Sequence, residues 1–151
     1  MSHLDTIKNL AKNIRIDILE MTSNANSGHP GGSLSATDIV SVLYGSILNY
    51  DSSNPKWEDR DRFVLSKAHA CPVLYAALAE TGYFDKSELM TFRKLNSRLQ
   101  GHAHIKTPGV EMSGGSLGQG LSFGVGVSLA AKVDQKNYRT FVLLGDGELN
   151  E

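Results

Sequence analysis

Cysteine is almost missing from this chain, and so are long hydrophobic runs. With Cys71 as the only cysteine, the 151 residues cannot form an internal disulfide or a zinc site built on several cysteines. No run of about 18 apolar residues occurs, so no membrane-spanning helix is expected, and the first residues lack the apolar core of a secretory signal. We therefore expect a protein of a reducing compartment, the cytoplasm, in which Cys71 is a small, partly buried thiol.

An excess of charge of either sign is also absent. Fifteen basic residues nearly balance sixteen acidic ones, which leaves a net charge of -1 and no general attraction for nucleic acid or an anionic membrane. No repeat, low-complexity tract or linker divides the chain, and 40% of its residues are hydrophobic. These features predict one globular domain over residues 1–151, with any phosphate site being local.

The first half of the chain shows helical periodicity interrupted by a glycine-rich segment. Apolar residues recur at spacings of three and four from residue 4 onward and predict an amphipathic helix that ends near Asn24. The segment SGHPGGSLS at 27–35 predicts a loop, because its glycines and its proline favour irregular backbone. Ser35 and Asp38 have the spacing of a capping box, which predicts that a second helix begins there.

Two short apolar runs predict buried strands, FVLS at 63–66 and TFVLL at 140–144. The second run is apolar on both faces, as expected of a parallel strand covered by helices. Between the strands, Pro72 in a first turn and Gly82 as a terminator predict one helix. Asp85 and Glu88 have capping spacing and predict another.

Small residues dominate a further predicted helix, LSFGVGVSLAAKV at 121–133. They leave room for another backbone and favour a close helix interface, although a looser, frayed segment is the alternative. The elements together predict an α/β fold, a mainly parallel sheet covered by helices. A strand covered on both faces is normally followed by a return helix, for which residues 145–151 leave no room. We therefore expect the fold to be incomplete at its C-terminal side and the chain to be truncated there.

The tripeptide GDG directly follows the second predicted strand. Ligands of parallel sheets collect beyond the carboxyl ends of the strands. Asp146 could offer a carboxylate oxygen to Mg²⁺, while Gly145 and Gly147 let the backbone turn and present N–H groups to a phosphate. GDG is equally typical of an ordinary turn, so both interpretations stay open.

The segment SGGSLGQG at 113–120 is a second candidate for phosphate binding. Its unhindered N–H groups and the start of the next helix can form an anion nest, with a flexible connection as the alternative. It is not a dinucleotide fingerprint, because Phe123 stands where that motif requires glycine or alanine.

Three histidines, His29, His69 and His102, lie in loops beside predicted element ends. Together they suggest a polar pocket that binds hydroxyls or phosphate and exchanges protons near neutral pH, whereas each alone is typical of a solvated loop histidine. His102 and His104 could also chelate a transition metal, but two ligands are weak evidence for such a site.

The acidic and basic residues of DRDR at 59–62 predict a solvated charge cluster, with an anion site at Arg60 or Arg62 as the alternative. A serine triad using Ser116 and Asp146 is disfavoured, because no G-x-S-x-G elbow occurs.

Several long motifs occur together in one order: SGHPGGSLSATDI, RDRFVLSKAHACPVLYAALAETGYF, LQGHA, PGVEMSGGSLGQGLS and LLGDGELNE. From about Asn24 to Glu151, the chain thereby resembles the N-terminal part of the transketolase family. The resemblance implies a thiamine-diphosphate-binding fold, in which this chain is the diphosphate-binding domain.

The resemblance also implies roles for individual residues. Asp146 matches the Mg²⁺ ligand, and the loops on either side of the cofactor supply the other matches. Those implied to bind the cofactor are His69, Gly115, Leu117, Gly145, Gly147 and, through a network joining paired active sites, Glu151; those implied to act in catalysis are His29, His69 and His102.

By this resemblance the protein is part of an enzyme of the pentose phosphate pathway. Such an enzyme moves a two-carbon ketol unit from a ketose phosphate to an aldose phosphate with thiamine diphosphate and Mg²⁺. Its partner is a C-terminal, pyrimidine-binding subunit or domain, and the assembly is a dimer or heterotetramer. The alternatives are an inactive scaffold of the same fold or another ketol-transfer enzyme, such as deoxyxylulose-phosphate synthase or dihydroxyacetone synthase.

The sequence departs from the family pattern in three places. Ala68 occupies a position where the family usually has glycine, and Ala103 one where it commonly has proline. Ser113-Gly114 replaces the usual Ser-Thr pair. The family's asparagine metal ligand would fall beyond Glu151, and the pyrimidine-binding domain with its activating glutamate is not in this sequence. We therefore expect the isolated chain to be inactive and to bind cofactor poorly.

Overall fold

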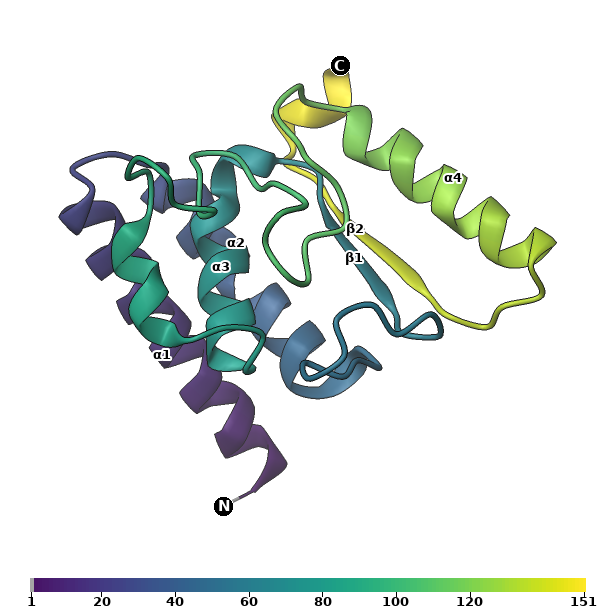
Figure 1. Cartoon of the computed structure of the whole chain (residues 1–151), viewed down its shortest axis with the longest axis horizontal. Coiled ribbons are helices and arrows are strands. Elements are labelled where there is room, and N and C mark those ends of the chain that lie inside the picture. Colours follow the sequence, from purple (N-terminus) through teal and green to yellow (C-terminus); the bar gives the residue numbers. More distant parts are fainter. Residues whose placement is uncertain (1) are drawn as a thin grey trace.

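A computed structural model describes residues 2–151 as helices on both sides of a two-stranded parallel sheet (Figure 1). The α-helices and strands are α1 (His3–Asn24), α2 (Pro30–Val42), β1 (Arg62–Leu65), α3 (Cys71–Glu80), α4 (Gln119–Val133) and β2 (Thr140–Leu143). The short helical turns are η1 (Leu43–Ile47), η2 (Ala68–Ala70), η3 (Lys86–Thr91) and η4 (Gly147–Asn150). Helices α1, α2 and α3 pack together on one side of the strands, and α4 lies on the other.

Helix α1 forms as its periodicity predicts. Ser2 Oγ accepts a hydrogen bond from the Asp5 N–H at 3.2 Å, and Asp5 Oδ2 accepts one from the Ser2 N–H at 2.9 Å, which caps the first turn. Ile14 and Ile18 of its apolar stripe are fully buried against α2 and α3, whereas Leu4 at the start of the stripe is exposed. The predicted end near Asn24 is confirmed.

Helix α2 begins five residues earlier than the capping pattern predicts, so the expected loop at 27–35 is wrong from residue 30 onward. Pro30 opens the helix, where its fixed φ suits the first turn and its missing N–H costs nothing. Ser35 lies inside the helix and donates its hydroxyl to the Gly32 carbonyl at 3.0 Å. The motif therefore presents His29 at a helix start rather than in a free loop.

Helix α3 confirms its predicted boundaries. Pro72 lies in the first turn, and Gly82 ends the helix with φ of +88°. All residues of α3 from 71 to 79 are buried. Cys71 is fully buried, and its burial raises the pKa of the thiol to about 12.

The helix predicted from Asp85 and Glu88 is wrong in type. Asp85 does cap the turn by accepting the Ser87 N–H at 2.8 Å, but η3 is a six-residue 3₁₀ helix. Glu88 does not complete a capping box, because its carboxylate binds the guanidinium of Arg98 in two hydrogen bonds of 3.0 and 2.7 Å.

The sheet is parallel and in register, with Phe63 opposite Phe141. Phe63 packs into the core with α3, while Val142 faces α4. A side chain on Gly124 of α4 would overlap Val142, so the small residues of α4 admit a strand rather than the expected helix. Strand β2 is partly exposed along its length, which corrects the expectation of full burial within the described residues.

Among residues 2–151, no helix combines the length and the hydrophobicity needed to cross a bilayer.

A buried acid lies between α1, α3 and η3. Asp17 is 1% exposed, and its Oδ1 lies 2.9 Å from Lys86 Nζ, which also pairs with Glu80. Burial raises the pKa of Asp17 from 3.8 to about 6, because the charged form loses its hydration and Glu80 is a second negative charge nearby. Asp17 therefore favours the folded state more when it is protonated.

The sign of this effect gives a prediction. Since the folded pKa exceeds the unfolded one, the contribution of Asp17 to stability should be present at pH 4 and lost as the pH rises through about 6. The wild-type protein should lose unfolding free energy between pH 4 and pH 7, and Asp17→Asn should make that loss smaller by about 1–2 kcal/mol. This range allows for solvent screening around Lys86, which is half-exposed.

Urea unfolding at both pH values measures this difference. The control is Asp38→Asn, which removes an exposed carboxylate paired with Arg15. An unchanged pH dependence in the Asp17 variant would contradict the assignment.

Candidate functional site

Three segments meet at the carboxyl ends of the two strands, where parallel sheets bind ligands. One leaves β1 through residues 66–70, another leads into α4 through 113–118, and the third leaves β2 through 145–151. Figure 1 shows η4 of the third segment beside the start of α4. The glycine motifs identified in the sequence therefore lie at one edge of the fold.

Two of the predicted histidines are in direct contact. The rings of His29 and His69 lie edge to face, with centroids 5.1 Å apart. Burial, followed by repulsion from His29, Lys67 and His102, lowers the pKa of His69. At neutral pH, His69 is therefore a neutral ring that can donate one hydrogen bond and accept another.

The segment that carries His102 is held by α3. The Tyr75 hydroxyl lies 2.9 Å from the Gln100 carbonyl and 3.2 Å from the His102 carbonyl. His102 is itself exposed. The structure thus brings the three histidines into one neighbourhood from three separate segments, while their chemical roles remain predictions.

Lys67 is a site residue that the sequence pattern did not reveal. It is 9% exposed, and its Nζ donates to the Gly32 carbonyl at 3.0 Å and lies 3.4 Å from Ser35 Oγ. These contacts fasten the segment after β1 to the first turns of α2. The side chain therefore stabilises the two elements that carry His69 and His29.

Glu148 is the second site residue that sequence reasoning missed. Its side chain accepts hydrogen bonds from Ser66 Oγ at 2.5 Å, from the Gly118 N–H at 3.0 Å and from the Gly145 N–H at 2.8 Å. Burial opposes ionisation of this carboxyl, but these hydrogen bonds outweigh it and lower its pKa. The sequence did carry a signal for this role, because the buried N–H groups of two glycine-rich loops need a hydrogen-bond acceptor nearby.

The bond to Gly118 changes the interpretation of the predicted anion nest at 113–120. Gly118 precedes α4 with φ of +79°, and its N–H is already taken by Glu148. The Gly114 N–H is also used, because it donates to the Ala103 carbonyl at 3.1 Å. A phosphate at this nest would therefore depend on other N–H groups of the loop.

Space and a free carboxylate remain at the edge of the site. A Cβ added to Gly115 or Gly147 would meet nothing within 4 Å, so the backbone is open to a ligand at both positions. Asp146 is exposed, and its carboxylate has no hydrogen bond or ion pair with any residue between 2 and 151. A hard oxygen donor is thus available next to open backbone.

The donor set bears on the kind of metal. No group of three His, Cys, Asp or Glu among the described residues is arranged to hold a metal ion. The His104 Nδ1 accepts the Lys106 N–H at 3.1 Å, so one nitrogen of the possible His102/His104 pair is occupied. A single carboxylate fits Mg²⁺, which commonly takes one or two carboxylates and completes its shell with phosphate and water oxygens.

The remaining predicted residues flank this opening. Glu151 is exposed, and its Cβ lies near Gly118, 3.1 Å from the place where a side chain would begin. Leu117, which precedes Gly118 in the chain, is half-buried. Both therefore lie beside the start of α4, and their cofactor contacts stay predictions.

The departures from the family pattern at residues 68, 103 and 114 meet at Gly114 in two contacts. A Cβ on Gly114 would overlap the Cβ of Ala68, so the alanine occupies the space that the glycine leaves. The carbonyl of the buried Ala103 accepts the Gly114 N–H. Gly114 and Ala68 are therefore complementary in size, and the loop that carries Gly115 packs directly on the segment that carries His69.

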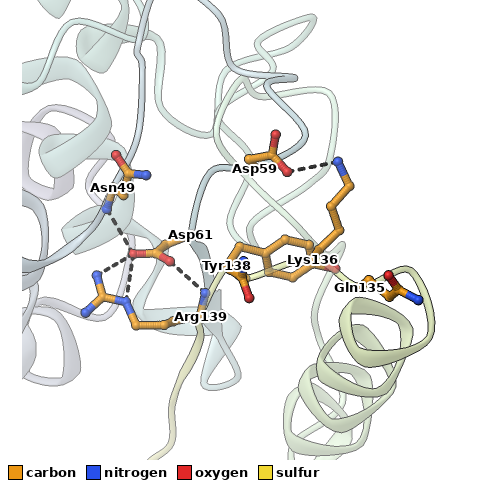
Figure 2. Close-up of a pocket in the computed structure, with 8 residues that line it drawn as sticks. Asn49, Asp59, Asp61, Gln135, Lys136, Tyr138 and Arg139 are labelled. Atoms are coloured by element: carbon orange, nitrogen blue, oxygen red, sulfur yellow. Dashed lines mark hydrogen bonds and ion pairs between the residues drawn. The ribbon is translucent and has the colours of Figure 1, made fainter.

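A separate polar cavity of about 440 Å³ lies at the opposite, amino ends of the strands. Figure 2 shows Asp61 between Asn49 and Arg139, and Lys136 beside Asp59. Asp61 is buried and accepts the Arg139 N–H at 2.7 Å, and hydrogen bonds from Arg139 lower its pKa despite the burial that opposes ionisation. The charged residues Asp61 and Arg139 that line this cavity therefore pair with each other and link the starts of the two strands.

The prediction of a solvated cluster at 59–62 is wrong for most of its members. Asp61 is buried, Arg60 donates to both carboxylate oxygens of Glu111 at 2.8 Å, and Arg62 lies over the Tyr138 ring, 4.3 Å from its centroid. Since both arginines have partners, neither is a free anion site.

Comparison with known proteins identifies relatives over nearly the whole chain. A family model described as "Transketolase, thiamine diphosphate binding domain" matches residues 6–151. Transketolase of Homo sapiens is 43% identical over 149 residues, which are 98% of this chain and 24% of that protein. A subunit of the apulose-4-phosphate transketolase of Phocaeicola vulgatus is 39% identical over 148 residues, which are 98% of this chain and 53% of that protein.

Solved structures agree on the fold. A Pichia stipitis transketolase in complex with sedoheptulose-7-phosphate superposes with a TM-score of 0.92 at 35% identity, over 99% of this chain and 24% of that one. The predicted α/β fold is therefore confirmed. The chain spans about a quarter of the length of the human and Pichia relatives and about half of the Phocaeicola protein.

The contact between Ala68 and Gly114 gives a prediction. Gly114→Ala should lower the unfolding free energy by about 1–3 kcal/mol, because the added methyl forces the two loops apart. Ala68→Gly in the same chain should recover most of the loss, which a double-mutant cycle of thermal unfolding measures. Gly126→Ala, which meets nothing within 4 Å, is the control; equal losses in the two single alanine variants would refute the contact.

Proposed function

The chain belongs to the transketolase family through its thiamine-diphosphate-binding domain, and we propose that residues 1–151 form the diphosphate-binding domain of such an enzyme. The proposed reaction transfers a two-carbon ketol unit from a ketose phosphate to an aldose phosphate, a step of the pentose phosphate pathway. The complex of the Pichia relative with sedoheptulose-7-phosphate, a seven-carbon sugar phosphate, supports this substrate class. A single, buried, reduced cysteine agrees with the cytoplasm as the proposed location.

One observation carries the cofactor assignment. The unpartnered carboxylate of Asp146 lies next to open backbone at Gly147, in the segment that follows β2. We assign Asp146 as the ligand of Mg²⁺, with the Gly145 and Gly147 backbone against the diphosphate. The donor set fits an ion that completes its shell with diphosphate oxygens rather than one enclosed by protein.

The remaining site residues surround the same opening. Gly115 and Leu117 would lie along the cofactor, and Glu151 would join the network between paired sites. When bound, thiamine diphosphate supplies the carbon nucleophile and the electron sink of the reaction. A neutral His69 suits proton transfer at pH 7, and His29 and His102 would orient the sugar hydroxyls.

The partner in this proposal is a C-terminal, pyrimidine-binding subunit or domain, in a dimer or heterotetramer. The Phocaeicola relative is named as one subunit of its transketolase, which supports an enzyme divided between chains. Ala68 fills the space beside Gly114, and the Ala103 carbonyl accepts the Gly114 N–H, so these departures give no reason to prefer an inactive scaffold.

The experiment that tests this function targets the metal ligand. Asp146→Ala should weaken Mg²⁺-dependent binding of thiamine diphosphate by about 100-fold or more, since even changes outside the ligand shell cost about 10- to 100-fold at metal sites. Calorimetry on the assembled enzyme measures the affinity. Asp134→Ala, which removes an exposed carboxylate at the end of α4, is the control. Unaltered cofactor affinity in the Asp146 variant would overturn the assignment.

A further inference from the structure

Glu148 joins three parts of the chain that are far apart in sequence. Its Oε1 accepts the Ser66 hydroxyl and the Gly118 N–H, and its Oε2 accepts the Gly145 N–H. Ser66 directly follows β1, Gly118 precedes α4, and Gly145 follows β2. A single carboxylate therefore connects all three segments that meet at the site.

Both oxygens of Glu148 are in use, and the residue is 4% exposed. A buried carboxylate costs free energy unless hydrogen bonds replace its hydration, so its position is determined by these donors. Three hydrogen bonds use most of the acceptor capacity of this carboxylate, and its burial closes it to a metal ion or a substrate. Its contribution to the site must therefore act through the residues it holds.

Two of the three donors are backbone groups of the glycine loops. Gly118 follows the open position of Gly115 by three residues, and Gly145 directly precedes Asp146. Among the described residues, no hydrogen bond or ion pair joins loop 113–118 to loop 145–147. Both loops instead donate hydrogen bonds to Glu148. Among residues 2–151, Glu148 is thus the side chain that forms hydrogen bonds with both loops.

We propose that Glu148 is a positioning residue that holds the loops 113–118 and 145–147 at a fixed separation before any ligand binds. The inference rests on the proposed function only for what the loops bind, namely the diphosphate and its metal ion. Fixing the loops in advance removes an ordering cost from binding, so cofactor affinity depends on Glu148 although it does not touch the cofactor.

Two variants separate this role from general stability. Glu148→Ala removes the acceptor for both glycine N–H groups, whereas Glu148→Gln keeps the shape but offers one acceptor oxygen and one N–H donor group. The matched control is Glu111→Gln. Glu111 is a partly buried carboxylate that binds Arg60 and lies outside both glycine loops.

The experiment has two readouts on the assembled protein. Hydrogen exchange is followed without ligand in peptides spanning 113–120 and 144–147, and the dissociation constant of thiamine diphosphate is measured with Mg²⁺. We expect Glu148→Ala to speed exchange about tenfold or more in both peptides and to weaken cofactor binding about tenfold or more. Glu148→Gln should do so in one of the two peptides, and Glu111→Gln in neither.

Protection that persists in both peptides of the Glu148 variants would overturn the proposal. So would faster exchange with an unchanged dissociation constant, because the loops would then not need to be held for binding. If Glu148→Ala does not fold, Glu148→Gln decides. If the wild-type protein binds no thiamine diphosphate, the proposed function fails, and the exchange measurement alone decides whether Glu148 holds the loops.

Discussion

The parallel pairing of β1 with β2 is the constraint on which the rest of the structure depends. Parallel neighbours cannot be joined by a tight turn, so the chain between them must cross over and return to the same end of the sheet. This crossover contains α3, the segment that carries His102, and α4. Because both strands run in one direction, the segments after them emerge at one edge, and every proposed site residue lies at or near it.

Two buried carboxylates close the two ends of this sheet. At the amino ends, Asp61 precedes β1 and accepts the N–H of Arg139, which precedes β2. At the carboxyl ends, Glu148 accepts hydrogen bonds from the segments that follow β1 and β2. In both cases hydrogen bonds outweigh the cost of burial and keep the carboxyl ionised. The same device therefore sets strand alignment at one end and loop placement at the other.

Close packing at the site edge depends on matched small residues. Gly120 of α4 abuts Ser66, and a Cβ there would come within 2.5 Å of the serine side chain. Gly114 leaves the space that Ala68 occupies in the neighbouring segment. Two residues that depart from the family pattern, Ala68 and Gly114, thus fit each other in size. This arrangement brings the loop of Gly115 against the segment of His69 with no room for a larger side chain.

Local sequence patterns determined several helices, one strand end and the family of this protein. Periodicity predicted α1, and boundary residues such as Pro72 predicted α3, because a helix repeats its own spacing and needs specific ends. The GDG motif after an apolar run placed Asp146 at a strand end, and long motifs indicated the family. Only the tertiary structure decided that α2 begins at Pro30 and that Glu148 is buried. Glu148 meets Ser66 from 82 positions away and Gly118 from 30, and no local spacing encodes which distant donor a carboxylate will reach.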